Sequence, residues 1–137
     1  MRRYLIILFF SIFLPCQAPV YPAFLIFQKP PVDQFEALFR ASCIVESNGN
    51  RFAYNYAEGA TGIVQIRPVR LRDYNKLTGS HYTMADMFNP YISRKIFMYY
   101  ARIIRDPESI ARQWNGGPRG MQKKSTIKYW NKIKKHL

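Results

Sequence analysis

The sequence predicts a single, mainly helical domain with one long loop rich in glycine and asparagine. Apolar residues recur every three or four positions in several segments, and proline follows a capping residue at two points, which are typical signs of helices. Segment 47–65 is polar and lacks this spacing of three or four positions. The chain has 137 residues, of which 48% are hydrophobic, so it is long enough and apolar enough to fold around one core.

The first predicted helix covers residues 34–45. Asp33 and Glu36 have the spacing of a capping box at its start. Its apolar face consists of Phe35, Leu38, Phe39 and Cys43. Glu46 therefore falls at the C-terminal end of this helix, between an apolar stretch and a polar loop.

The segment Ser47–Gln65 is expected to form an irregular loop or a small hairpin beside an active-site cleft. Its many glycine and asparagine residues favour turns over regular structure. We expect Gly59 and Gly62 to serve the backbone, either through a positive φ or through close approach of another group.

Five helical segments follow the loop. Pro68 opens a helix that continues to Leu77, with Gly79 as its stop, and the Thr83-x-x-Asp86 spacing predicts a short helical turn. Asn89-Pro90 begins a long helix to Ile104. The last two predicted helices, separated by a break at 115–118 (NGGP), are a short one from Asp106-Pro107 to Trp114 and a basic one over 125–136.

The N-terminus reads as an export signal over residues 1–18, followed by a linker over 19–31 and the folded domain over 32–137. Arg2 and Arg3 precede an apolar stretch at 4–14 that is too short to span a bilayer comfortably. Because Pro19 would hinder the peptidase and apolar residues resume at 20–27, an uncleaved membrane anchor over 4–27 is the alternative. Either way we expect an exported protein of the periplasm or cell envelope.

The chain is strongly basic, with 21 Lys and Arg against 8 Asp and Glu, a net charge of +13. This charge favours an anionic polymer or a membrane surface, or it serves general solubility. A nucleic-acid partner is not expected, because the chain has an export signal and no nucleic-acid-reading motif.

The few cysteines and histidines indicate no metal site. Two Cys and two His at these spacings form no zinc pattern. If Cys16 leaves with the leader, Cys43 has no internal disulfide partner, and we expect it to be a small core residue.

Glu46 is the candidate general acid. Cleavage of a glycosidic bond needs an acid that stays protonated, and partial burial achieves this. Ile44 and Val45 supply apolar surroundings on one side. By itself, however, a glutamate at a helix end is an ordinary surface residue.

Four sequence blocks in order give Glu46 a context. They are Glu46-Ser47 with the later GATGIVQ segment (59–65), DMFNP (86–90), ARQWNGG (111–117) and the Thr126-x-x-Tyr129-Trp130 ending. Together they resemble the soluble lytic transglycosylase-like (SLT) family, over about residues 32–133. The resemblance implies the goose-type lysozyme fold, a mainly helical α+β arrangement.

The resemblance also implies site roles. Glu46 would be the single acid/base, Ser47 and Gln65 would hold the sugar or its acetamido group, Asn115 would contact the glycan from the opposite wall, and Tyr129 would place its hydroxyl beside Glu46. Structural alternatives stay open, because Ser47 can end the helix, Gln65 can cap a backbone group and Tyr129 can be a core aromatic.

Several residues depart from the family pattern. Trp114 replaces a tyrosine, Gln113 and Gly116 replace alanines, and Arg67 and Arg70 add charge beside Gln65.

The function implied is that of an exported lytic transglycosylase that cleaves the MurNAc–GlcNAc β-1,4 bond of peptidoglycan and forms 1,6-anhydroMurNAc. No metal or organic cofactor is needed. The alternatives are a hydrolytic muramidase on the same fold, or a non-catalytic basic module that binds cell wall. The nearby acids Glu58 and Asp73 are expected to be solvated charges, which favours the transglycosylase because a hydrolase of the usual kind needs two carboxylates.

The expected partners follow from this function. Peptidoglycan glycan strands are the substrate, the protein acts as a monomer, and its N-terminus is a possible point of membrane association. A secretion, conjugation or phage apparatus is one setting that would use such an enzyme, and general wall turnover is another.

Overall fold

The computed structural model describes residue 33 and residues 35–137, and within them the chain is mainly helical, as predicted. The predicted leader and linker lie outside the described residues. The elements, in order, are α1 (Glu36–Ser47), β1 (Tyr54–Asn55), β2 (Ala60–Thr61), α2 (Pro68–Thr78), the 3-10 helix η1 (Met84–Phe88), α3 (Pro90–Ile104), α4 (Pro107–Gly116), the 3-10 helix η2 (Gly120–Gln122) and α5 (Ser125–Lys134). No helix in this part of the chain is long and apolar enough to cross a membrane.

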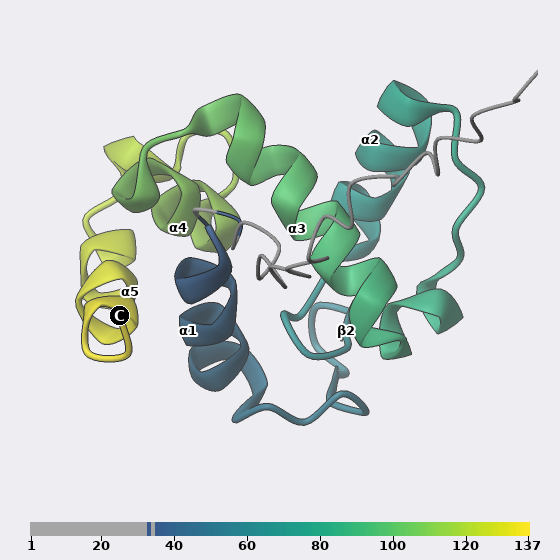
Figure 1. Ribbon diagram of the computed structural model, residues 1–137, viewed down its shortest axis with the longest axis horizontal. Coiled ribbons are helices and arrows are strands. Elements are labelled where there is room, and N and C mark those ends of the chain that lie inside the picture. Colours follow the sequence, from purple (N-terminus) through teal and green to yellow (C-terminus); the bar gives the residue numbers. More distant parts are fainter. Residues whose placement is uncertain (1–32, 34) are drawn as a thin grey trace, which may run out of the picture. The chain divides into compact units, whose positions relative to one another are not determined.

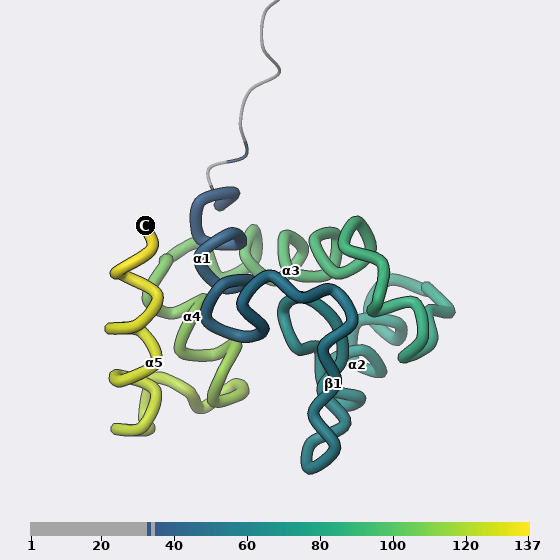
Figure 2. The backbone as a smooth tube through the Cα atoms, turned by 90° about the horizontal axis from the view of Figure 1, so that it is seen from below, coloured from purple at the N-terminus to yellow at the C-terminus, as the bar shows by residue number. Residues whose placement is uncertain are grey.

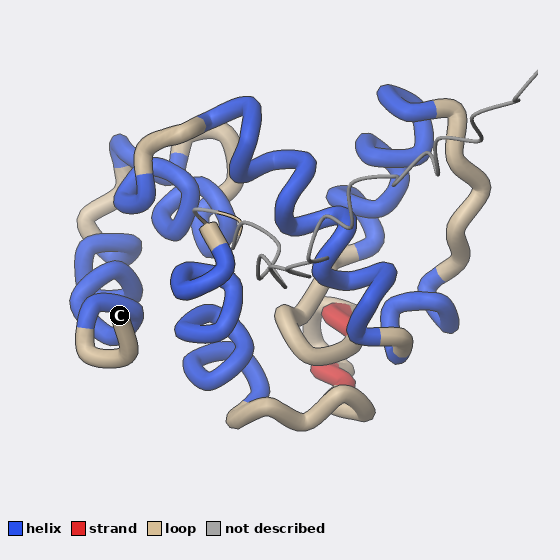
Figure 3. Tube along the Cα trace, viewed as in Figure 1, coloured by secondary structure: helices blue, strands red, loops and turns tan. Residues whose placement is uncertain are grey.

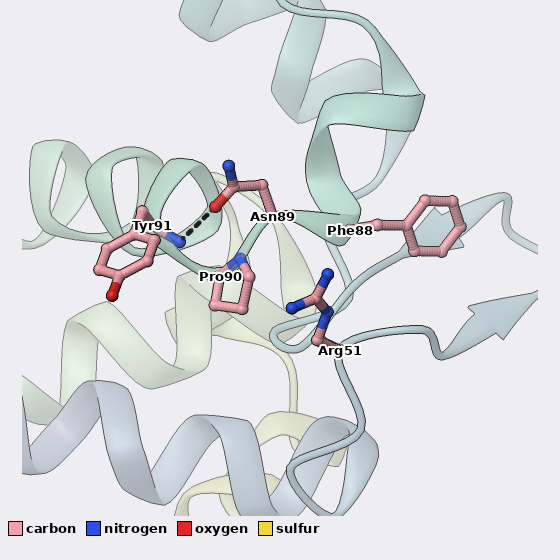
Figure 4. A pocket seen from close by; sticks show the side chains of 5 residues that line it. All are labelled: Arg51, Phe88, Asn89, Pro90 and Tyr91. Atoms are coloured by element: carbon pink, nitrogen blue, oxygen red, sulfur yellow. Dashed lines mark hydrogen bonds between the residues drawn. The ribbon is translucent and has the colours of Figure 1, made fainter.

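Helix α3 forms the centre of the core. Asn89 caps its start by accepting a hydrogen bond from the Tyr91 N–H at 3.0 Å, and Pro90 occupies its first turn (Figure 4). The helix runs between α1 and α4 on one side and α2 on the other (Figure 1). Its fully buried Phe97 packs against Phe39 of α1 and Trp114 of α4, with ring centroids 5.4 and 4.9 Å apart.

Helix α5 packs beside α4 and α1 (Figure 2). Its buried side is formed by Thr126, Tyr129 and Ile133. The buried guanidinium of Arg112 joins α4 to this region, because it donates to Thr126 Oγ1 at 3.1 Å and to the Met121 carbonyl at 2.8 Å. These contacts fix the helix that carries Tyr129.

The loop after α1 contains a small antiparallel hairpin in which Tyr54 faces Thr61 and Asn55 faces Ala60 (Figure 3). Gly62 has φ +83°, and a Cβ built there would lie 2.0 Å from the Met87 carbonyl oxygen. The prediction that Gly62 serves backbone geometry is therefore confirmed, through both positive φ and close approach.

Helix starts were predicted better than helix ends. The short helical turn after Thr83 and the starts of α2, α3, α4 and α5 are confirmed, and Thr83 and Asp86 form a capping box at that turn. Three ends differ by two residues: α1 continues past Val45 to Ser47, α4 continues through Asn115 to Gly116, and α5 stops at Lys134. Helix α2 ends one residue later than predicted, at Thr78. Helix α4 can continue because Gly116 lies against Thr126, where a Cβ would come within 2.6 Å of the threonine methyl group.

The predicted capping box at the start of α1 is also wrong. The helix begins at Glu36, and the Asp33 carboxylate accepts from the Phe35 N–H at 3.0 Å. The Glu36 carboxylate instead pairs with Arg94 of α3 at 2.6 Å. The Glu36 side chain, which the local spacing predicted to cap the helix, thus forms a long-range ion pair instead.

Candidate active site

Glu46 lies in the last turn of α1. Asn48 caps the end of the helix, with φ 53° and a backbone N–H that donates to the Ile44 carbonyl at 2.9 Å. The buried face of α1 packs on the core through Leu38, Phe39 and Cys43. This anchoring holds Glu46, which is partly buried, at a fixed place beside α5.

The structure brings Glu46 and Tyr129 together. The Tyr129 hydroxyl donates a hydrogen bond of 2.8 Å to Glu46 Oε1, although the two residues are 83 positions apart. Tyr129 is buried, with 8% of its surface exposed. Burial and the neighbouring Glu46 charge raise the pKa of Tyr129 well above its ordinary value, so its hydroxyl stays protonated and acts as a donor.

Burial raises the pKa of the Glu46 carboxyl above its ordinary value of 4.5. The hydrogen bond from Tyr129 and the positive charges of Arg67 and Arg70 act in the opposite direction but do not cancel this effect. A carboxyl in this state keeps its proton at a higher pH than a solvated one. That is the property a general acid requires.

Ser47 joins the end of α1 to the loop. Its hydroxyl donates to the Ile63 carbonyl at 2.7 Å and is 3.2 Å from the Cys43 carbonyl. The proton of Ser47 is thus directed at the backbone, and only its oxygen remains to accept from a ligand.

Gln65 holds the loop in a similar way. Its backbone has a left-handed φ of 51°, and its Nε2 donates to the Gly62 and Ala53 carbonyls at 2.9 and 3.2 Å. Gln65 therefore caps backbone carbonyl groups, which is the structural role stated above as its alternative. Any contact with a sugar is left to its Oε1 atom.

Asn115 is in α4, directly after the buried Trp114, and is partly exposed. Among the described residues, no hydrogen bond joins its side chain to Glu46, Gln65 or Tyr129. The roles of Ser47, Gln65 and Asn115 toward a glycan remain predictions.

The two acids expected to be solvated are at the surface. Glu58 is exposed and accepts from Arg67 Nε at 2.9 Å, and Asp73 is exposed on α2. Cys43 is buried, and burial raises the pKa of its thiol to about 12. The thiol is therefore unsuited to act as a nucleophile, which agrees with a core role.

Arg70 is a feature of the site that the sequence indicated only as extra charge. Its guanidinium lies over the Trp114 ring at 4.3 Å and the Tyr100 ring at 5.0 Å. Its Nη2 donates to the Gln113 and Trp114 carbonyls at 3.0 and 3.1 Å. In the sequence, the available signal for Arg70 was its three-residue spacing from Arg67 at the start of α2. This spacing places both arginines on one helix face.

A separate hollow of about 540 Å³ lies at the start of α3 (Figure 4). It is lined by Arg51, Phe88, Asn89, Pro90 and Tyr91. None of these is a predicted site residue and none is an acid, so this hollow offers no general acid.

Comparison with known proteins decides the family. The model of the transglycosylase SLT domain family matches residues 32–137. The chain belongs to this family. Its sequence is also similar to a lysozyme of Meretrix lusoria, with 61% identity over 28 residues, which are 20% of this chain and 23% of that protein. The chain thus matches about a quarter of the length of that lysozyme.

Proposed function

We propose that the protein is an exported lytic transglycosylase of peptidoglycan, with Glu46 as its single acid/base. The observation that carries this proposal is the partly buried Glu46 carboxyl, held by the 2.8 Å hydrogen bond from Tyr129. Its raised pKa suits the donor of a proton. The nearest acid in the loop, Glu58, is exposed and paired with Arg67, so it makes a poor second catalytic carboxylate.

The reaction has two steps. Glu46 donates its proton to the oxygen between MurNAc and GlcNAc, the C1–O bond breaks, and the GlcNAc end leaves with a free 4-hydroxyl. The muramoyl acetamido group or the electrostatics of the site stabilises the electron-poor C1. The Glu46 carboxylate then takes the proton from the MurNAc C6 hydroxyl while O6 bonds to C1, which closes the 1,6-anhydro ring and restores the acid.

The surface charge of the domain supports an anionic polymer as substrate. No Asp or Glu follows Glu108 in the sequence. The exposed lysines of this C-terminal part are Lys123, Lys124, Lys128, Lys132, Lys134 and Lys135. Peptidoglycan carries lactyl and peptide carboxylates, so long-range attraction would bring it to this surface.

The test is digestion of purified peptidoglycan with the wild-type protein and with Glu46→Gln, followed by mass spectrometry of the products. The proposal expects 1,6-anhydroMurNAc ends, and at least about a 100-fold lower rate for Glu46→Gln, because general acid catalysis contributes roughly 10²–10⁴-fold. Wild-type turnover by Glu46→Gln would rule out its catalytic role.

The same experiment separates the alternatives. Reducing ends, heavier by one water, would make the protein a muramidase. Binding without cleavage by the wild type would indicate a cell-wall-binding module.

Export is a proposal that rests on residues 1–18. Fusion of residues 1–31 to a phosphatase that is active only outside the cytoplasm tests it, with Leu8→Arg as the control that interrupts the apolar stretch. Equal phosphatase activity with and without the leader would contradict export.

A further inference from the structure

The outer side of α5 is a basic surface. Thr126, Tyr129 and Ile133 form the buried side of this helix. Figures 1 and 2 show α5 at one end of the domain, with α4 and α1 beside it on the inner side. The exposed lysines of the outer side are Lys124, Lys128, Lys132, Lys134 and Lys135. We call these five lysines, together with Ile127, the α5 face.

The charges of the α5 face are unpaired in the part of the chain that the structure describes. None of the five lysines forms an ion pair there. Glu108, the last acidic residue of the sequence, is already paired with Arg112 at 2.8 Å. Lys124, Lys128, Lys132 and Lys135 follow one another at spacings of four, four and three residues, so they form one stripe along the helix. Such a stripe attracts an extended anionic partner.

An apolar side chain lies within this basic surface. Ile127 is 43% exposed, and it is three residues after Lys124 and seven before Lys134, so all three point outward. The partly exposed Trp130 flanks it, and its ring centroid lies 5.7 Å from Lys134 Nζ. Any anionic polymer would attract the lysines, but a lipid bilayer also offers an apolar layer to Ile127. Indole rings are likewise enriched where lipid meets water.

Docking through the α5 face leaves the candidate active site open. Tyr129 belongs to the opposite, buried side of α5, where its hydroxyl donates to Glu46 at 2.8 Å. A bilayer on the outer side would therefore lie across α5 from Glu46. The protein would then stay at a membrane while it binds a polymer on its other side.

We propose that the α5 face docks on a bilayer that contains anionic lipids. The lysines contact the phosphate-bearing headgroups, and Ile127 enters the boundary between headgroups and acyl chains. Clusters of about four to eight basic residues are typical of such contacts. This inference concerns a second surface of the protein and does not depend on the reaction proposed above.

The test uses the native tryptophans of the full-length protein as probes of contact. Of the two, Trp114 is only 4% exposed, so a quencher carried by lipids reaches Trp130 alone. Vesicles of brominated phosphatidylglycerol are compared with vesicles of brominated phosphatidylcholine. We expect quenching by the anionic vesicles only, and its loss in about 1 M NaCl, where the Debye length is about 3 Å. Equal quenching by the two kinds of vesicle, or quenching that salt leaves unchanged, would overturn the proposal.

Substitutions localise the contact. Lys128→Glu combined with Lys135→Glu should raise the anionic lipid concentration for half-maximal quenching at least about 25-fold, since each basic residue near the surface contributes roughly fivefold. The matched control, Arg72→Glu with Lys76→Glu, makes the same charge change at exposed positions of α2, which lies across α3 from α5 (Figure 1). Residues 1–31 are the same in all these proteins, so any difference comes from the folded domain. An equal effect of the two double variants would mean that net charge, and not the α5 face, governs binding.

A second substitution separates a bilayer from a glycan as the partner. Ile127→Asn should weaken binding to the anionic vesicles about tenfold, because an apolar side chain is lost from the boundary. The same substitution should leave binding to purified peptidoglycan unchanged, measured in Glu46→Gln protein to prevent turnover. If the lysine substitutions weakened binding to peptidoglycan but left quenching by the vesicles as in the wild type, the α5 face would bind glycan and the membrane proposal would be wrong.

Discussion

Tyr129 of α5 and Glu46 of α1 share a hydrogen bond of 2.8 Å that ties the last helix of the domain to the first. The pair combines a donor that keeps its proton with an acid whose pKa burial has raised. The first two predictions concern this pair.

Tyr129→Phe should extend activity to higher pH while lowering its maximum. The hydrogen bond lowers the pKa of Glu46, so its removal raises that pKa further. A general acid works only while protonated, and the falling limb of the pH profile should therefore move upward. We expect a loss of roughly tenfold or more in kcat/KM, because hydrogen bonds to charged groups contribute about 1.5–3 kcal/mol. If the falling limb of the pH profile stayed at its wild-type pH, Tyr129 would have no effect on the ionisation of Glu46.

Glu46→Gln should stabilise the fold at neutral pH. In the folded protein the Glu46 pKa lies above its ordinary value of 4.5, so the charged form is disfavoured there. Wild-type stability should fall as pH rises from 4.5 through the folded pKa, and the glutamine variant lacks this loss. Thermal melts should give the variant a higher Tm at pH 7, with a gap that closes below pH 4.5. A gap that is constant with pH would contradict this linkage.

Gly62→Ala should unfold or strongly destabilise the domain. The position has φ +83° and the Met87 carbonyl oxygen lies 2.0 Å from where Cβ would be. We expect a loss above about 3 kcal/mol, since strain and overlap act together. Gly49→Ala is the matched control, because Gly49 has φ +77° but nothing within 4 Å of its Cβ site, so only about 1–2 kcal/mol should be lost. Urea unfolding measures both, and equal losses would mean that the contact with Met87 is unimportant.

Cys43 should resist alkylation in the folded protein. Burial raises the pKa of its thiol to about 12 from an ordinary value of 9.0. At pH 8 the thiolate fraction should therefore be roughly 10³-fold smaller than in an unfolded chain. Iodoacetamide labelling with peptide mapping checks this, and urea should make Cys43 reactive. Equal labelling with and without urea would place the thiol at the surface.

The parts of the fold set by neighbouring residues were predictable from the sequence. Asn89-Pro90 fixes the start of α3 because both the cap and the proline act within one turn. Glu36 misled the prediction because its partner, Arg94, is 58 residues away. The end of α4 was missed for the same reason, since Gly116 is accommodated against Thr126 of another helix.

The candidate site likewise contains residues that were predictable from the sequence and residues that were not. Glu46 and Tyr129 were found through a resemblance whose motifs record long-range contacts indirectly. The orientation of Arg70 was not predictable, because it depends on Tyr100 and Trp114, which are 30 and 44 residues away. No local pattern around Arg70 encodes those aromatic rings.

The loop that joins α1 to α2 is fixed through its backbone. Ser47, Gln65 and Trp114 all donate to its carbonyl groups, at Ile63, Ala53, Gly62 and Val64. The outward side chains Tyr54 and Tyr56, which are 48% and 91% exposed, take no part in this bonding. Positions 54 and 56 are therefore free to vary in sequence without loss of the loop's shape, whereas Asn55, whose Oδ1 accepts from the Ala57 and Glu58 N–H groups, and Gly59, with φ +62°, are not. This makes the two tyrosine positions a natural place for relatives to diverge and for engineers to randomise.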